Sequence, residues 1–190
     1  TLLPTVSNVT SSATNGTFTI GDSISIQVTF TEAVTVTGTP QLTLETGSTD
    51  RAVDYVSGGG TTTLTFTYTV QAGDSSTDLD YVSTSSLALN GGSIVDAATN
   101  TATLTLPTPG ASGSLGANKA IVVTSSPTKV VSVRTPVGTA SGAAFTTQPR
   151  VSLQDLGNNV VVSDSSTVVT ATVSAGASLV GTRTATAVNG

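Results

Sequence analysis

Side-chain oxygens are the groups with which this sequence could do chemistry. Asp78 and Asp80 form an Asp-x-Asp pair, whose side chains would share one face of a strand. Asp96 and Asn100 lie four residues apart, and Glu32 follows an alternating apolar segment. Calcium takes carboxylate and carbonyl oxygens as ligands, so it is the metal that this composition favours. These five residues are therefore candidate calcium ligands.

The same residues have a structural alternative. Aspartates in Gly-Asp and Asp-x-x-x-Asn segments commonly cap turns by accepting hydrogen bonds from their own backbone. Thr99 stands where such calcium loops commonly carry glycine, which weakens the case for Asp96. The segment from Asp155 to Asn158 is interpreted as a turn. For the five candidates, both interpretations stay open.

Composition excludes several other kinds of chemistry. The 190 residues include no Cys, His, Met or Trp. Disulfides, the usual Cys/His zinc sites and histidine-dependent nucleophilic catalysis are therefore excluded. Paired carboxylates also serve glycoside hydrolysis, but three Tyr and four Phe are too few for a sugar platform, and several of them fall on core-facing positions. We predict that the chain is not an enzyme.

Charge and hydropathy also limit the partners. Six Lys and Arg stand against eleven Asp and Glu, a net charge of −5, so nucleic-acid binding is not expected. No apolar run approaches the roughly 18–20 residues that span a bilayer, so membrane insertion is not expected either. The chain opens at Thr1 without a signal-like segment, and we expect a mature chain or a piece of a longer one. Abundant Thr and Ser with little Lys favour a secreted or surface protein of a bacterium.

Period-two alternation is the dominant pattern, and it predicts strands. In 61–70, apolar residues at every second position alternate with threonines, and 23–30 repeats the pattern. Turn-forming segments such as Asn15-Gly16, Gly58–Gly60 and Asn90–Gly92 separate these runs. A helical period is nearly absent. An all-β antiparallel sandwich is therefore expected.

A linker around Pro127 predicts two domains, 1–125 and 126–190. The first is long enough for a complete sandwich. The second is short, since a seven-stranded sandwich usually needs about 100 residues. We expect it to be truncated at its C-terminal end, with unpaired edges and an exposed core, unless another chain or segment covers the gap.

Several motifs point to a known kind of module. They are Gly21-Asp22 with the strand after it, Gly38 to Leu44, Tyr55 to Tyr68, Gly73-Asp74, Asp78 to Tyr81, Asn90 to Ile94 and Asp96 to Asn100. With them, residues 17–123 resemble the immunoglobulin-like (Ig-like) repeats of large bacterial surface and secreted proteins. Thr147 to Asn158 and Ala187 to Gly190 make residues 129–190 similar to a second type of Ig-like repeat, found in adhesins and invasin-like stalks.

The resemblance implies two tandem antiparallel Ig-like β-sandwiches, the second incomplete. It implies a structural repeat or spacer of an extracellular adhesin, stalk or filament, with neighbouring repeats or subunits of the same protein as partners. It also implies that such repeats bind calcium in loops or at domain junctions. Two alternatives stay open: an adhesive module that binds calcium or a cell-surface glycan, and a filament subunit that accepts a strand from its neighbour.

Overall fold

The chain divides into two compact units. The computed structural model describes residues 2–125, 127–138, 142–155, 158, 160–161, 164–172 and 182–189. Unit 1 spans Thr1–Thr124 and unit 2 spans Ser125–Gly190. The boundary predicted after residue 125 lies one residue from this division.

Unit 1 is rich in strands, and its described residues include a single helical turn. Its described elements, in chain order, are β1 (Val6–Ser11), β2 (Gly16–Phe18), β3 (Ser23–Thr37), β4 (Gln41–Leu44), β5 (Arg51–Ser57), β6 (Thr61–Thr69), β7 (Leu87–Ala88), β8 (Ser93–Val95), α1 (Leu115–Asn118) and β9 (Ile121–Val123).

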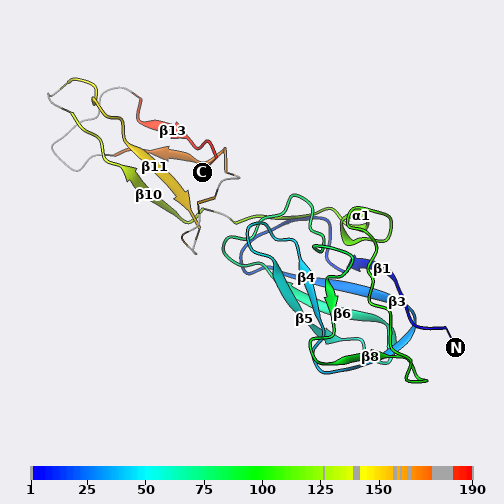
Figure 1. Cartoon of the computed structure of the whole chain (residues 1–190). Coiled ribbons are helices and arrows are strands. Elements are labelled where there is room, and N and C mark those ends of the chain that lie inside the picture. Colours follow the sequence, from blue (N-terminus) through cyan, green and yellow to red (C-terminus); the bar gives the residue numbers. More distant parts are fainter. Residues whose placement is uncertain are drawn as a thin grey trace. The chain divides into compact units, whose positions relative to one another are not determined.

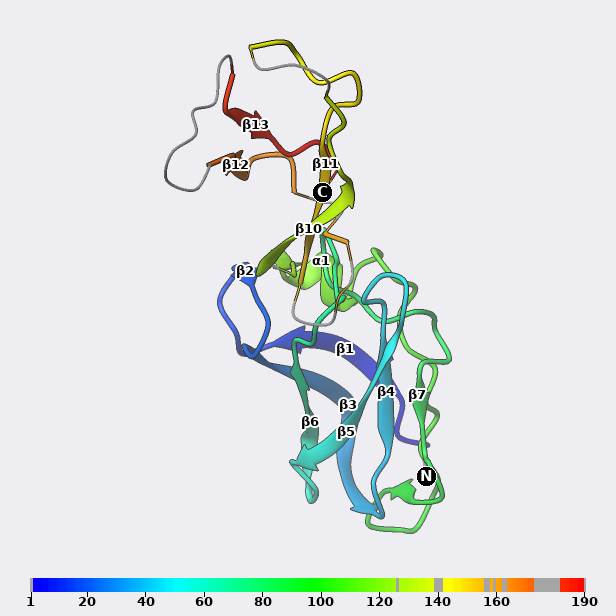
Figure 2. The ribbon, with the colours of Figure 1, turned by 90° about the vertical axis from the view of Figure 1, so that its left-hand side faces the viewer.

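A curled antiparallel sheet forms the body of unit 1 (Figures 1 and 2). Its strands follow the order β1-β3-β6-β5-β4-β7, and β8 pairs with β3 beside this path. β2 and β9 form a separate parallel pair. The helical turn α1 is capped by Ser114, whose hydroxyl accepts a hydrogen bond from the backbone N–H of Ala117.

The predicted alternation is confirmed in β3 and β6. Leu64, Phe66 and Tyr68 of β6 are buried, while the threonines between them are half-buried or exposed. Opposite them, Ile24, Ile26 and Val28 of β3 are fully buried. The register pairs apolar with apolar, Ile26 with Phe66 and Val28 with Leu64, so both strands turn the same kind of face to the core.

β3 is long enough to serve two parts of the sheet. It has 15 residues, and its first part pairs with β1 on one edge and β6 on the other. The register with β6 shifts between Thr29 and Val34. Beyond this irregularity, Thr35 to Thr37 pair with β8. Such irregularities bend a strand, and this one lies where β3 changes partners as the sheet curls.

Unit 2 consists of two separate ribbons in its described part. β10 (Lys129–Arg134) pairs with β11 (Arg150–Gln154), and β12 (Val168–Thr170) pairs with β13 (Thr184–Thr186). Of the 24 buried hydrophobic residues that the structure describes, 22 belong to unit 1, and Leu153 and Val161 alone belong to unit 2. The described part of unit 2 thus has a very small core of its own.

The prediction of an all-β chain is confirmed as a curled antiparallel sheet with almost no helix. In the second domain, the sequence also predicts a strand at 160–162. The structure shows one bridge there, between Gln154 and Val160, and Val162 lies outside the described residues. The sequence further predicts strands at 167–173 and 182–188. The structure has the shorter strands β12 and β13 in these two segments, and Val173 is also outside the described residues. Within the described ranges, no helix has the length and hydropathy to cross a bilayer.

Candidate interaction surface

The structure brings Asp78 and Asp80 together. A Cβ atom built on Gly116 of α1 would lie 3.0 Å from Oδ2 of Asp80 and 3.5 Å from Oδ2 of Asp78. Asp80 is buried, and its carboxylate accepts hydrogen bonds from the backbone N–H groups of Tyr81 and Gly110, each at 2.9 Å. Asp78 is exposed. Asp80 therefore anchors two loop segments, and Asp78 adds a second carboxylate beside it.

Asp96 and Asn100 form the turn that the structural alternative describes. Oδ1 of Asp96 accepts from the backbone N–H groups of Ala98 and Asn100, both at 2.8 Å. Oδ2 accepts from Nδ2 of Asn100 at 2.6 Å. Thr99 adopts a left-handed conformation with φ of 66°, which is strained for a β-branched residue. This turn is closed by its own side chains.

These hydrogen bonds, led by that from the Asn100 side chain, lower the pKa of Asp96, although burial acts in the opposite direction. Because the pKa is lowered in the folded state, the stabilisation is present above the unfolded-state pKa of about 3.9. It is lost as the pH falls through the folded-state pKa. The Asp96 carboxylate therefore contributes to stability at neutral pH and ceases to do so in acid.

Glu32 lies half-buried in β3. Among the described residues, no group of three or more Asp or Glu side chains is placed to hold a metal ion. The five predicted ligands thus form one pair of carboxylates, one Asp-Asn turn and one separate glutamate. Calcium binding by these residues stays a prediction.

A buried polar network in unit 1 was not predicted. Asp74 is 1% exposed, and its Oδ1 lies 2.7 Å from Nη2 and accepts from Nε of Arg51 at 2.8 Å. Its Oδ2 accepts from the Tyr68 hydroxyl at 2.7 Å and from the backbone N–H of Gln71. Burial, followed by the hydrogen bond to Asp74, raises the pKa of Tyr68 far above its ordinary value. The Gly73-Asp74 turn was the only sequence signal for this network.

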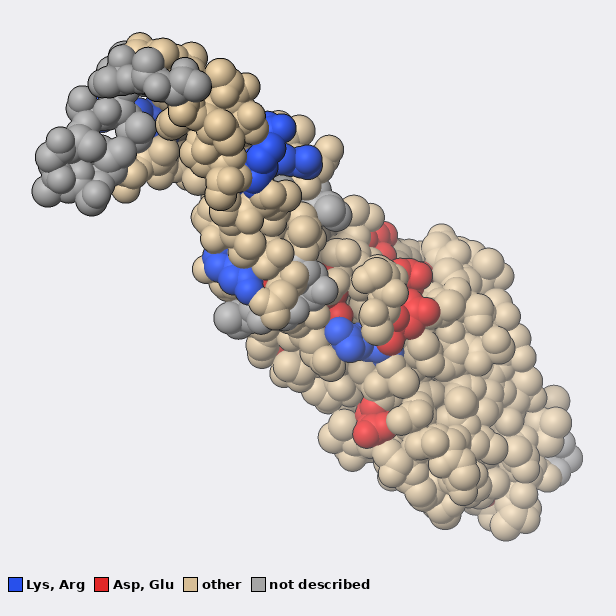
Figure 3. Space-filling view, turned by 60° about the vertical axis from the view of Figure 1, so that its left-hand side comes forward, with Lys and Arg blue, Asp and Glu red and all other residues tan. Residues whose placement is uncertain are grey.

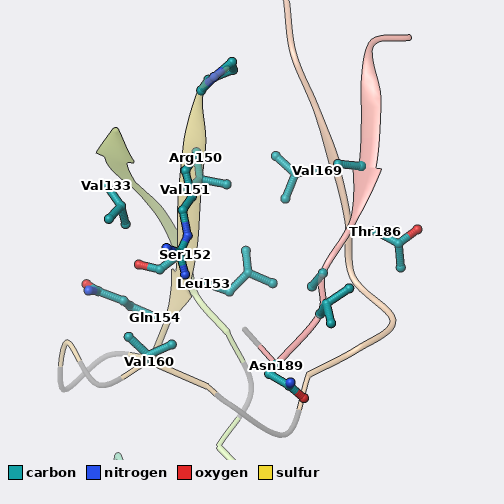
Figure 4. A pocket seen from close by; sticks show the side chains of 14 residues that line it. Val133, Arg150, Val151, Ser152, Leu153, Gln154, Val160, Val169, Thr186 and Asn189 are labelled. Carbon is teal, nitrogen blue, oxygen red and sulfur yellow. The ribbon is translucent and has the colours of Figure 1, made fainter. Parts of the chain in front are cut away.

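Unit 2 contains an open groove of about 590 Å³ between its two ribbons (Figure 4). Most of its lining residues are apolar. In Figure 4, Leu153 of β11 and Val169 of β12 point into the space between the ribbons from opposite sides. Val133 and Val160 also line the groove and are 57% and 44% exposed. Side chains of this kind normally pack against a neighbour, so the groove has the character of an uncovered interface.

Two arginines lie at one end of the ribbon formed by β10 and β11. The backbone register places Arg134 of β10 directly opposite Arg150 of β11. Nε of Arg134 donates to the carbonyl of Gln148, and Arg150 lines the groove. Like charges placed opposite each other on paired strands destabilise the pair. In the described part of the chain the single ion pair is Arg51–Asp74 of unit 1, so neither arginine has a carboxylate partner there.

Charge is divided unevenly between the units. Nine acidic and two basic residues give unit 1 a formal charge of −7, while two acidic and four basic residues give unit 2 a charge of +2. In Figure 3 acidic side chains gather on the face of unit 1, and basic side chains stand out on unit 2. The Asp164 carboxylate of unit 2 already accepts hydrogen bonds, first from the Thr167 side chain and then from the backbone of Ser166 and Thr167, and they lower its pKa.

Comparison of the chain with protein-family models, with curated proteins and with solved structures finds no match. The resemblance to bacterial Ig-like repeats therefore stays a prediction. The groove, the arginine pair and the buried network are known from the structure of this chain alone.

Replacing Asp74 with Ala should lower the free energy of unfolding of unit 1 by about 3 kcal/mol. The reason is that Arg51 would lose its counter-ion, while the Tyr68 hydroxyl would lose its acceptor. Urea unfolding followed by circular dichroism measures the change. The matched control is Asp54→Ala, which removes an exposed carboxylate bonded to Gln41 and should cost less than about 0.5 kcal/mol. Equal costs for the two variants would contradict a special role for Asp74.

Replacing Thr99 with Gly should raise the free energy of unfolding by about 1 kcal/mol, because glycine adopts the left-handed conformation without strain. The control is Thr49→Gly, at an exposed position without a positive φ, which should be destabilising. Thermal unfolding of both variants gives the comparison. A lower Tm for Thr99→Gly would show that the Thr99 side chain contributes more than its backbone strain costs.

Proposed function

We propose that this chain is a structural module, a load-bearing spacer of an extracellular bacterial assembly. The observation that carries the proposal is how unit 1 holds its first and last strands. When a pulling force is applied to the two ends of the unit, it acts first on these two strands. In unit 1 both are hydrogen-bonded along both edges.

The first strand, β1, pairs with β3 along one edge. On the other edge, the backbone N–H of Val9 donates to the carbonyl of Gly113 at 2.8 Å. Nδ2 of Asn118 donates to the carbonyl of Val9 and to Oδ1 of Asn8, both at 2.8 Å. Peeling β1 from the unit therefore requires two sets of hydrogen bonds to break together.

The last strand, β9, is held in the same manner. It pairs with β2 in parallel, Gly16 opposite Ile121. On its other edge, Val123 of β9 forms a bridge with Ser76. The backbone N–H of Leu79 donates to the carbonyl of Ile121 at 2.8 Å. The Lys119 ammonium, just before β9, donates to the carbonyl of Ala13. The exit strand of unit 1 is thus an interior strand.

The polar groups of unit 1 support the same role. Asp74, Asp80 and Asp96 are buried carboxylates, and each one fastens a loop through hydrogen bonds to neighbouring groups. Among the described residues, every buried side-chain nitrogen or oxygen has a hydrogen-bond partner. Carboxylates that hold loops in place through hydrogen bonds contribute to the stability of a scaffold.

The proposal includes the finer architecture and the setting. We take unit 1 to be an Ig-like β-sandwich, with β3 joining its two layers, and unit 2 to be an incomplete Ig-like sandwich. The resemblance of residues 17–123 and 129–190 to bacterial repeats, together with the Thr-rich outer faces and low charge, supports an extracellular location. Neighbouring repeats or subunits of the same protein are the proposed partners.

Single-molecule pulling on the full chain tests this function. Unit 1 should unfold in one cooperative step that releases about 400 Å of chain. Asn118→Ala should lower the unfolding force, because it removes two hydrogen bonds that hold one edge of β1. The control Gln41→Ala removes an amide bonded to Asp54 on the exposed surface and should leave the force unchanged. Gradual extension of unit 1 without a distinct step would overturn the load-bearing role.

Calcium binding is a second candidate, favoured by the convergence of Asp78 and Asp80 beside Gly116. On this hypothesis, calcium raises the Tm of the chain relative to a chelator, since a ligand that binds the folded state stabilises it. Asp78→Asn should abolish the shift and Asp54→Asn should retain it. An unchanged Tm, or a shift that survives in Asp78→Asn, would contradict a site at this pair.

A further inference from the structure

The groove of unit 2 combines an apolar floor with an unpaired cationic end. Val133, Val151 and Leu153 line it beside Arg150, and Arg134 lies directly across the ladder from Arg150. The described residues supply no carboxylate to this arginine pair. A guanidinium group presents a planar set of donors that matches a carboxylate. The surface that fits this groove is therefore apolar in part and acidic at one end.

Unit 1 carries such a surface. The turn between β4 and β5 exposes Glu45 and Asp50. The backbone N–H of Glu45 donates to the carbonyl of Asp80, which places the segment around Asp78 against this turn. Val82, at the end of the same segment, is 42% exposed and donates to the carbonyl of Thr43. We call this surface, formed by Glu45, Asp50, Asp78 and Val82, the acidic end of unit 1.

We propose that the groove of unit 2 docks on the acidic end of unit 1 of a second copy of this chain. The inference rests on the proposed structural role and specifies the partner. The argument is charge complementarity, between a unit of formal charge +2 with two unpaired arginines and a unit of charge −7. Complementary potentials of this kind select the partner and its orientation.

The assembly is head to tail. Two different surfaces meet, so each copy keeps one free groove and one free acidic end, and the contact can repeat along a line. A symmetric pair made through two grooves would bring four arginines together. A symmetric pair made through two acidic ends would bring their carboxylates together. Both symmetric pairs are disfavoured by like-charge repulsion.

Sedimentation of the full chain at low and high ionic strength is the first test. At about 20 mM salt we expect the mean mass to rise with protein concentration beyond that of a dimer. At about 500 mM salt we expect a monomer, because charges separated by more than a few ångströms are then screened. A monomer at both ionic strengths, or a dimer whose mass does not respond to salt, would overturn the proposal.

Charge exchange identifies the two surfaces. Arg134→Glu with Arg150→Glu should weaken association at least about tenfold at low salt. The matched control is Lys129→Glu, at the other end of β10, where the ammonium donates to the Asn158 side chain. This change should have a much smaller effect. Circular dichroism checks that each variant keeps its fold, as expected for exposed side chains.

A second pair of changes makes the test reciprocal. Glu45→Arg with Asp50→Arg should also prevent association. An equimolar mixture of this variant with Arg134→Glu/Arg150→Glu should associate again, since each groove then meets an end of opposite charge. Absence of rescue would overturn the assignment of the acidic end. The pulling experiment on unit 1 is independent of these results, so failure of docking and failure of the load-bearing role are distinguishable.

Discussion

The two-residue alternation along β3 is the constraint on which unit 1 depends. β3 pairs with β1, β6 and β8, and its inward side chains Ile24, Ile26 and Val28 are fully buried. A slip of one residue in its register would turn these side chains to solvent and bring polar ones into the core. Because three strands take their register from β3, one apolar stripe determines the placement of most of the sheet. The irregularity between Thr29 and Val34 then allows a single strand to serve both parts of the curl.

The register of β3 fixes the sheet but not the loops. In unit 1, buried carboxylates hold the loops through hydrogen bonds. Asp74 joins the segment after β6 to Arg51 at the start of β5. Asp80 joins its own segment to Gly110, 30 residues further along the chain. These hydrogen bonds are sheltered from water, and the low local dielectric strengthens them. The same shelter keeps Asp74 and Asp80 away from solvent.

The features predicted from sequence are those that depend on neighbouring residues. Alternation identifies the buried faces of β3 and β6, and the short spacing between Asp96 and Asn100 indicates a turn. Pairings across long separations could not be predicted, because strand register and loop packing bring them about. Arg51 meets Asp74 across 23 residues, and Arg134 meets Arg150 only through the register of β10 with β11. The groove of unit 2 and its cationic end required the structure.

The described part of unit 2 forms two ribbons, and apolar side chains from both ribbons line the groove. An open apolar groove would bind many apolar partners without discrimination. The arginine pair limits this unselective binding. An uncharged apolar segment that covered Arg134 and Arg150 would remove two guanidinium groups from water without giving them a counter-ion, at a large cost in free energy. A segment with carboxylates at that end avoids the cost. The charges that weaken the β10–β11 ladder thus make the groove selective for an acidic partner.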